Sequence, residues 1–189
     1  MNKRLPITQI TKNKEVFNNL PKANVSFKVN NNVAFSFKDF KCKCIKTKDF
    51  NNCFSNMWEY AEWSLIVIKR ISSYSTMTVQ ELKEGGRSTR CHPVLGKDLE
   101  KLKNILSLID YKPEFLTQLE EDGFWELTIE RALGRMYGYF VDNIYYVLLF
   151  DPHHLIYPDL KMGCQYDLLH KNHDPWSEIE KIEDRISGL

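Results

Sequence analysis

The 189-residue sequence lacks any apolar segment long enough to cross a membrane, which requires about 20 residues. Its longest apolar run, Ile144 to Phe150, has the length of a β-strand. The charged start of the chain is not followed by an apolar stretch, so no secretory signal is predicted. Glycine and proline are scarce, at eight and seven residues, which excludes a low-complexity chain. We therefore expect a soluble, cytoplasmic protein with no membrane partner.

The sequence also lacks the cysteine pattern and the short motifs of common enzyme classes. Its five cysteines are odd in number and contain no C-x-x-C pair, so we expect reduced thiols rather than a disulfide framework. Walker-type, G-x-G-x-x-G and G-x-S-x-G motifs are absent, which leaves nucleotide hydrolysis and acyl transfer without support. The potential zinc ligands match no common zinc spacing; they are His153, His154, Cys164, His170 and His173. The sequence predicts neither a metal nor another cofactor.

Positive charge is concentrated at the beginning of the chain. Residues 1–50 hold 11 Lys or Arg against three Asp or Glu, whereas the whole chain has a net charge of +1. Such asymmetry is typical of a basic nucleic-acid-binding face, but it also describes an ordinary lysine-rich surface. The candidate phosphate-binding lysines are Lys38, Lys41 and Lys43.

The hydrophobic pattern predicts an α+β fold. We expect a flexible arm over residues 1–20 and a single domain over 21–189. Alternating apolar residues at 25–29 and 33–37 flank an Asn-rich break and predict an N-terminal hairpin. Helical spacing predicts helices over 56–73, after Thr78, over 97–109, from Pro113 and over 175–186. The first of these carries apolar residues on more than one side, so we expect it to be largely buried.

The C-terminal third predicts a three-stranded antiparallel meander beginning at Trp125. Asp142-Asn143 is a two-residue hairpin turn between two apolar strands. A regular register from this turn pairs Val141 with Ile144 and Arg135 with Phe150. Arg135 is then the one charged residue on an apolar face, so it requires either a buried ion pair or a ligand. The expected architecture is an antiparallel sheet packed against the helical middle segment and a C-terminal helix.

Two clusters carry residue types suited to chemistry. The segment Arg87-x-x-Arg90-x-His92 combines two guanidinium groups with an imidazole, which suits phosphate binding with His92 as general acid or base. It is equally consistent with a solvated loop. The second cluster pairs Arg135 with the segment from Asp151 to Pro158, where the last strand of the hairpin ends. A structural Asp-Pro turn is the alternative there.

These segments together resemble a family of small uncharacterised bacterial proteins associated with mobile elements. The resemblance rests on Arg90-Cys91-His92, on the Gly134–Gly138 strand, and on the strand ending in Asp-Pro-His-His-Leu-Ile-Tyr-Pro at 151–158. It covers roughly residues 35–160. No activity follows from it.

A weaker resemblance is to RelE-type ribonuclease toxins, which also have an Arg-bearing strand followed by an apolar strand with a His-containing end. It implies metal-independent RNA cleavage, with Arg90 and Arg135 holding the phosphate, His92 or His154 moving protons and Tyr157 in support. Such toxins are about half as long as this chain and strongly basic, which this sequence is not.

The functional hypothesis is a nucleic-acid-associated protein of a bacterial defence or mobile-element system, in the form of a toxin-like endoribonuclease. The alternative is a non-catalytic module that binds a protein or a nucleic acid. The two differ in geometry. The enzyme requires Arg90, His92, Arg135 and His154 to converge in one cleft, with Arg87 and the lysines contacting RNA, whereas the binding module predicts these residues on separate surfaces.

Overall fold

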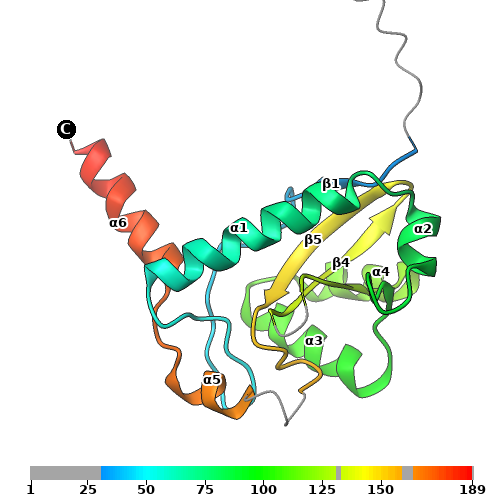
Figure 1. Cartoon of the computed structure of the whole chain (residues 1–189). Coiled ribbons are helices and arrows are strands. Elements are labelled where there is room, and N and C mark those ends of the chain that lie inside the picture. Colours follow the sequence, from blue (N-terminus) through cyan, green and yellow to red (C-terminus); the bar gives the residue numbers. More distant parts are fainter. Residues whose placement is uncertain (1–30, 131–132, 159–163, 189) are drawn as a thin grey trace, which may run out of the picture. The chain divides into compact units, whose positions relative to one another are not determined.

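Five strands form one mixed sheet in the order β1-β5-β4-β3-β2 (Figure 1). The computed structural model describes residues 31–130, 133–158 and 164–188. β1 (Ala34–Ser36) lies parallel to β5 (Ile144–Asp151). β4 (Arg135–Val141), β3 (Trp125–Thr128) and β2 (His92–Pro93) follow in antiparallel pairs. The predicted α+β class and the C-terminal meander are confirmed.

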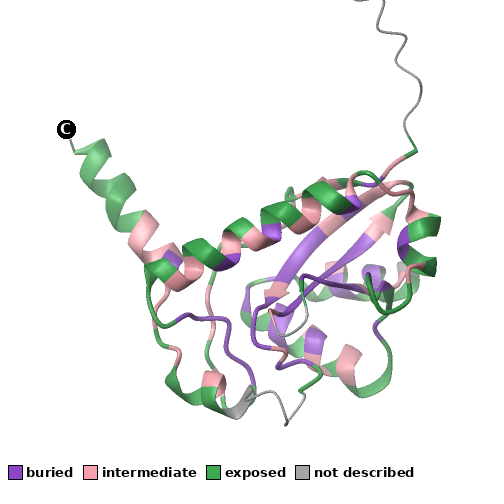
Figure 2. Ribbon diagram, viewed as in Figure 1, coloured by how far each residue is buried: buried purple, intermediate pink, exposed green. Residues whose placement is uncertain are grey.

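The helices pack on both faces of this sheet. They are α1 (Met57–Tyr74), α2 (Val79–Glu84), α3 (Gly96–Leu108) and α4 (Pro113–Asp122). Two further helices follow the sheet in the chain, α5 (Cys164–His170) and α6 (Pro175–Ser187), and α6 extends away from the sheet (Figure 1). One core joins α3 and α4 to Tyr137 and Tyr139 of β4, and the other joins α1 and α2 to Met136 of β4. The alternation of side chains along β4 therefore divides the interior into two layers (Figure 2).

Local sequence signals set the helix ends. Asn56 caps α1 by accepting the Glu59 backbone N–H at 2.9 Å, and Thr78 and Glu81 form the capping box of α2. Pro113 occupies the first turn of α4, which ends at Gly123 with φ +89°. All of the predicted helices are present. The short α5 was not predicted. Among the described helices, none has the length and apolarity needed to cross a membrane.

The N-terminal prediction is tested only in part. The predicted arm at 1–20 and the strand at 25–29 lie outside the described residues. The second strand of that hairpin is β1, and its Ala34 N–H donates to the Asn143 carbonyl at 2.9 Å. Lys38, Lys41 and Lys43 follow β1 in an irregular segment rather than on a sheet face, because the chain turns at Phe37 and Phe40.

The prediction that α1 is largely buried is wrong. Only Trp63, Val67 and Tyr74 are buried, whereas Trp58, Leu65 and Ile68 are exposed. The helix covers the sheet with one face and leaves a second apolar face outward (Figure 2). Its sequence is apolar on both sides, and composition alone does not separate a core face from an outward one.

The β4–β5 hairpin keeps the predicted register near its turn and loses it farther along. Val141 pairs with Ile144 and Tyr139 with Tyr146, as predicted. A β-bulge at Tyr137/Gly138 then shifts the pairing by one residue, so Arg135 faces Asp151 rather than Phe150. Gly138 permits this because a Cβ there would lie 2.0 Å from the Tyr146 carbonyl oxygen. The bulge places Arg135 at the end of the hairpin where β5 runs into its loop.

Candidate functional site

Three adjacent strands place chemically useful side chains in one row across the sheet. His92 of β2 pairs with Glu126 of β3, and Glu126 pairs with Tyr137 of β4. Because Cα partners in antiparallel strands present their side chains to the same face, the three groups are neighbours. The His92 Nε2 lies 2.9 Å from Glu126 Oε1. This contact orients the imidazole ring, whose side chain is 55% exposed, against a carboxylate that is 10% exposed.

Arg135 forms a buried ion pair with the same carboxylate. Its Nε lies 3.4 Å from Glu126 Oε1, and its Nη1 donates to Thr128 Oγ1 at 2.8 Å and to the Gly134 carbonyl at 3.1 Å. Thr128 is the Cα partner of Arg135 on β3. Of the two possibilities that the sequence left open for Arg135, the buried ion pair is present. The guanidinium also lines a cavity, described below, so a ligand contact is compatible with it.

A tight turn after β5 holds His154 against the start of β4. Asp151 is fully buried and accepts the backbone N–H groups of Leu155 at 2.9 Å and Ile156 at 2.8 Å. Burial raises the pKa of Asp151, while these backbone N–H groups and His153 oppose the rise. Within this turn His154 adopts φ +56°, and its Nε2 accepts the Gly134 N–H at 2.9 Å. This bond favours the neutral imidazole with its proton on Nδ1.

Eight side chains from these segments line one cavity of about 350 Å³, named here the polar cavity. They are Arg90, His92, Asp98, Glu126, Arg135, Tyr137, His154 and Tyr157. All five residues predicted as catalytic are among them, so the convergence that the ribonuclease hypothesis requires is present. Their roles remain predictions. Arg90 makes no ion pair with the described residues, and its exposed guanidinium is available to an anion.

Sequence reasoning missed three residues of the polar cavity. Asp98 lies in the first turn of α3, Glu126 on β3 and Tyr137 on β4. The signal for Glu126 was its place in an alternating strand beside a strand that carries Arg135. The alternation along this strand places the ring of Tyr137 on the apolar face, but it does not show that the hydroxyl group lies beside Glu126.

The Tyr137 hydroxyl is buried beside the Glu126 carboxylate and has no hydrogen bond of regular geometry to the described residues. The side chain is 1% exposed, and its Oη is closed to solvent although the residue lines the polar cavity. Burial raises its pKa well above 10, and the nearby Asp151 and Glu126 carboxylates add to the rise. The hydroxyl therefore stays protonated. Because Oη is closed to solvent, a ligand in the cavity would contact it only after the neighbouring side chains move.

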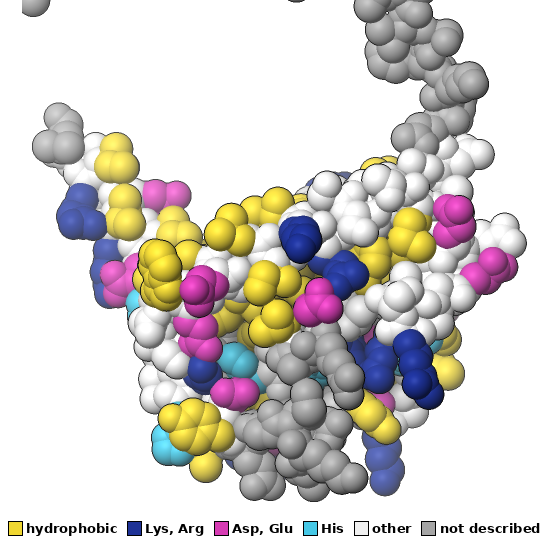
Figure 3. Space-filling view, in the orientation of Figure 1, with side chains coloured by type: hydrophobic (Ala, Val, Ile, Leu, Met, Phe, Trp, Pro, Cys, Tyr) yellow, Lys and Arg dark blue, Asp and Glu magenta, His cyan; other side chains and the backbone are white. Residues whose placement is uncertain are grey.

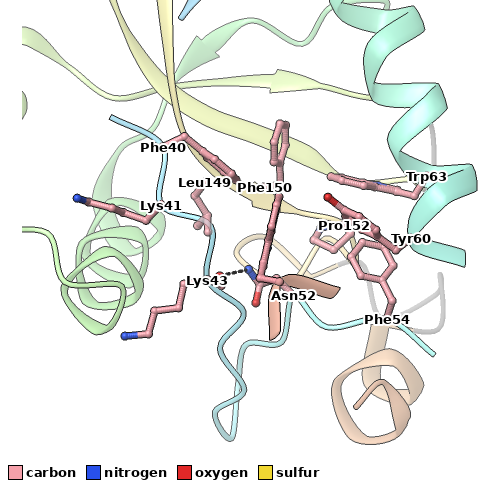
Figure 4. Close-up of a pocket in the computed structure, with 11 residues that line it drawn as sticks. Phe40, Lys41, Lys43, Asn52, Phe54, Tyr60, Trp63, Leu149, Phe150 and Pro152 are labelled. Atoms are coloured by element: carbon pink, nitrogen blue, oxygen red, sulfur yellow. Dashed lines mark hydrogen bonds between the residues drawn. The ribbon is translucent and has the colours of Figure 1, made fainter. Parts of the chain in front are cut away.

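A second cavity, the aromatic cavity, contains the basic residues that the charge distribution had suggested. It has a volume of about 20 Å³. Its lining includes Lys41, Lys43, Asn52 and mostly aromatic side chains: Phe40, Phe54, Tyr60, Trp63, Phe150 and Trp176 (Figure 4). The two ammonium groups point away from the rings (Figure 4). Lys43 pairs with Asp110 at 2.7 Å, and Lys41 lies 5.9 Å from the Tyr111 ring centre.

None of the residues predicted to bind nucleic acid lines the polar cavity. Lys41 and Lys43 line the aromatic cavity, and Lys38 is exposed beyond β1 and lines neither cavity. Arg87 is exposed in the turn that precedes Arg90 but is not part of the polar cavity lining.

Two other histidines make contacts elsewhere in the fold, and the Nε2 of His173 is buried without a hydrogen bond to any described residue. His153 Nε2 contacts the Cys53 carbonyl oxygen at 2.6 Å, and its Nδ1 lies 3.8 Å from Asp167. The backbone of His173 bridges to Phe54. Within the described ranges, no three His, Cys, Asp or Glu side chains are close enough together to hold a metal ion.

Comparison with known proteins gives a family but no activity. Searches of the curated proteins and of the solved structures found no match. The resemblance to RelE-type toxins is not confirmed, and the association with bacteria and mobile elements stays a prediction. Residues 36–176 match the model of the family described as "Uncharacterised protein UU032", and the chain belongs to that family.

Proposed function

We propose that the polar cavity binds a phosphodiester of RNA and cleaves it without a metal ion. The observation that carries this proposal is the convergence of Arg90, Arg135 and His92 on one cavity. Two guanidinium groups are suitable donors to the non-bridging oxygens of a phosphate. The imidazole beside them supplies acid–base chemistry near neutral pH.

His92 is the proposed proton acceptor. Its Nε2 lies 2.9 Å from Glu126 Oε1, and its Nδ1 lies 3.4 Å from the Pro93 carbonyl oxygen. In the proposed step the substrate replaces this long second contact, and Nδ1 takes the proton of the RNA 2′-hydroxyl. Glu126 then stabilises the imidazolium that forms. The 2′-oxygen attacks phosphorus, the bond from phosphorus to the 5′-oxygen breaks, and the 5′-oxygen takes a proton from water. The products are a 2′,3′-cyclic phosphate and a 5′-hydroxyl.

His154 has a different proposed role. Because its Nε2 accepts the Gly134 N–H, protonation at that nitrogen would break the bond. His154 therefore positions the start of β4, which carries Arg135, rather than moving the proton. Tyr157, which is 69% exposed, provides a surface for a base next to the phosphate.

The test uses end-labelled single-stranded RNA and the full chain in excess EDTA. We expect cleavage products that end in 2′,3′-cyclic phosphate, and we expect no cleavage at a linkage whose ribose is replaced by 2′-deoxyribose. The variant His92→Gln should lose cleavage and keep its thermal unfolding temperature, because the side chain is mostly exposed. Intact RNA, or equal cleavage of DNA, would contradict the proposal. RNA binding without cleavage would support the non-catalytic alternative.

A further inference from the structure

Helix α1 has two apolar faces, and the sheet covers only one of them. The inner face contributes Trp63, Val67 and Tyr74 to the core. On the outer face Trp58 is 72% exposed, Leu65 67% and Ile68 62%. Figure 3 shows hydrophobic side chains gathered along this helix. Monomeric proteins rarely leave a continuous apolar strip of this kind in water.

The outer residues follow the spacing of a coiled-coil seam. Five of the exposed positions follow one another after three, four, three and four residues; they are Trp58, Ala61, Leu65, Ile68 and Ser72. This spacing has a period of 3.5 residues, which keeps one face turned toward a partner helix. No charged residue interrupts the seam. The outer face is therefore patterned for another helix rather than for a flat surface.

Two opposite charges flank the seam on one side. Glu62 and Lys69 are exposed, lie seven residues apart, and make no ion pair with the described residues. The flank on the other side of the seam carries no charge; its residues are Met57, Ser64 and Ile71. A parallel copy of the helix would place the charged flank beside the uncharged one. An antiparallel copy would place like flanks together.

We propose that the outer face of α1 binds the same face of a second copy of this chain, with the two helices antiparallel. A two-fold axis near Leu65 then puts Glu62 beside Lys69 of the partner subunit, and Lys69 beside Glu62 of the partner subunit. The charge pattern is complementary to itself only in this arrangement, as a two-fold interface requires. An 18-residue helix is about 27 Å long, so the buried area is small and the dimer is weak, with a Kd on the order of 10 µM.

The test measures the molecular mass of the full chain by sedimentation equilibrium over a range of concentrations. Wild type should dimerise. Glu62→Lys and Lys69→Glu should each raise the Kd about tenfold, because each variant brings like charges together. A one-to-one mixture of the two variants should dimerise at least as well as wild type, since every contact across the axis is then attractive.

The matched control is Glu100→Lys, an equally exposed charge reversal on α3. It should leave the Kd within about twofold of wild type. Leu65→Lys, at the centre of the seam, should abolish dimerisation, and its circular dichroism should match wild type because the side chain is exposed. A monomer at all concentrations would overturn the proposal. So would mixed variants that associate no better than either variant alone.

Discussion

The polar cavity and the aromatic cavity contain different kinds of chemistry, and the difference shows where function is encoded. The aromatic cavity lies by the most basic part of the sequence, yet its volume is about 20 Å³ and its neighbour Lys43 is already paired with Asp110. The polar cavity draws on parts of the chain with little net charge, yet it has about 350 Å³ of space and the exposed guanidinium of Arg90. The distribution of charge along the sequence pointed to the lysines, whereas the candidate site was identified by the residues that lie together in the folded structure.

The contacts among its lining residues indicate that the aromatic cavity is a structural element. Trp63 and Phe150 pack edge to face at 5.2 Å, and Phe54 lies 5.3 Å from Trp63. The Trp63 indole also donates to the Leu133 carbonyl at 2.9 Å. These contacts connect α1 to the end of β5 and to the loop before β4. The aromatic cavity thus supports the strands from which the polar cavity is built.

The largest effect that separates the two cavities is expected from His92→Ala. Loss of the proposed proton acceptor should lower the rate of RNA cleavage about a thousandfold, and single-turnover kinetics measure this change. The unfolding free energy should change little, because the side chain lies mostly in solvent. A loss of less than threefold would remove His92 from the mechanism.

A smaller effect is expected from Asp151→Asn in the turn that holds His154. Weakening two buried hydrogen bonds to the carboxylate should lower the free energy of unfolding by about 2 kcal/mol, measured by urea titration. Burial raises the pKa of Asp151, so the folded state holds this proton to a higher pH than the unfolded state. The Asp151 carboxyl group contributes most to the free energy of unfolding below about pH 4, and this contribution falls as the pH rises through the folded-state pKa.

The loss of unfolding free energy caused by Asp151→Asn should therefore be larger at pH 4 than at pH 7. Urea titrations of wild type and variant at the two pH values give the comparison. A cost that grows toward pH 7 would contradict the raised pKa.

The next effect concerns the exposed guanidinium of Arg90. Arg90→Gln should weaken binding of a non-cleavable RNA analogue about tenfold without lowering stability, because the side chain is exposed and makes no ion pair with the described residues. Isothermal titration and thermal unfolding measure the two quantities. Unchanged binding would remove Arg90 from the phosphate site.

The smallest effect is expected in the aromatic cavity. The double variant Lys41→Ala, Lys43→Ala should change RNA affinity by less than about twofold at 0.15 M salt, because exposed charges contribute little there. The same titration measures it. A loss of tenfold or more would move the RNA contact to this surface.

Much of the fold could be predicted because its signals are local. The Asn56 cap, the capping box at Thr78 and the turn at Asp142-Asn143 each depend on residues within a few positions of one another. The β-bulge could not be predicted. It depends on the close approach of Gly138 to the Tyr146 carbonyl, which only the paired strands define.

The positively charged residues of the candidate site could be predicted from the sequence, whereas its carboxylates could not. Arg135 was conspicuous because a charged residue on an apolar face needs a partner. Glu126 was not, because its contacts to His92 and Arg135 depend on the registers of β2, β3 and β4. The outward face of α1 was predicted wrongly for a similar reason. The sequence shows apolar residues on more than one side of the helix, but it does not show which side the sheet covers.

The most direct test of the central claim is an NMR titration of the full chain with a single-stranded RNA analogue whose scissile ribose is 2′-deoxyribose. The account predicts that saturable shift changes concentrate at the backbone amides of Arg90, His92 and Gly134, and at the ring protons of His92 and His154. Changes confined to Lys41 and Lys43, or no saturable change, would contradict it.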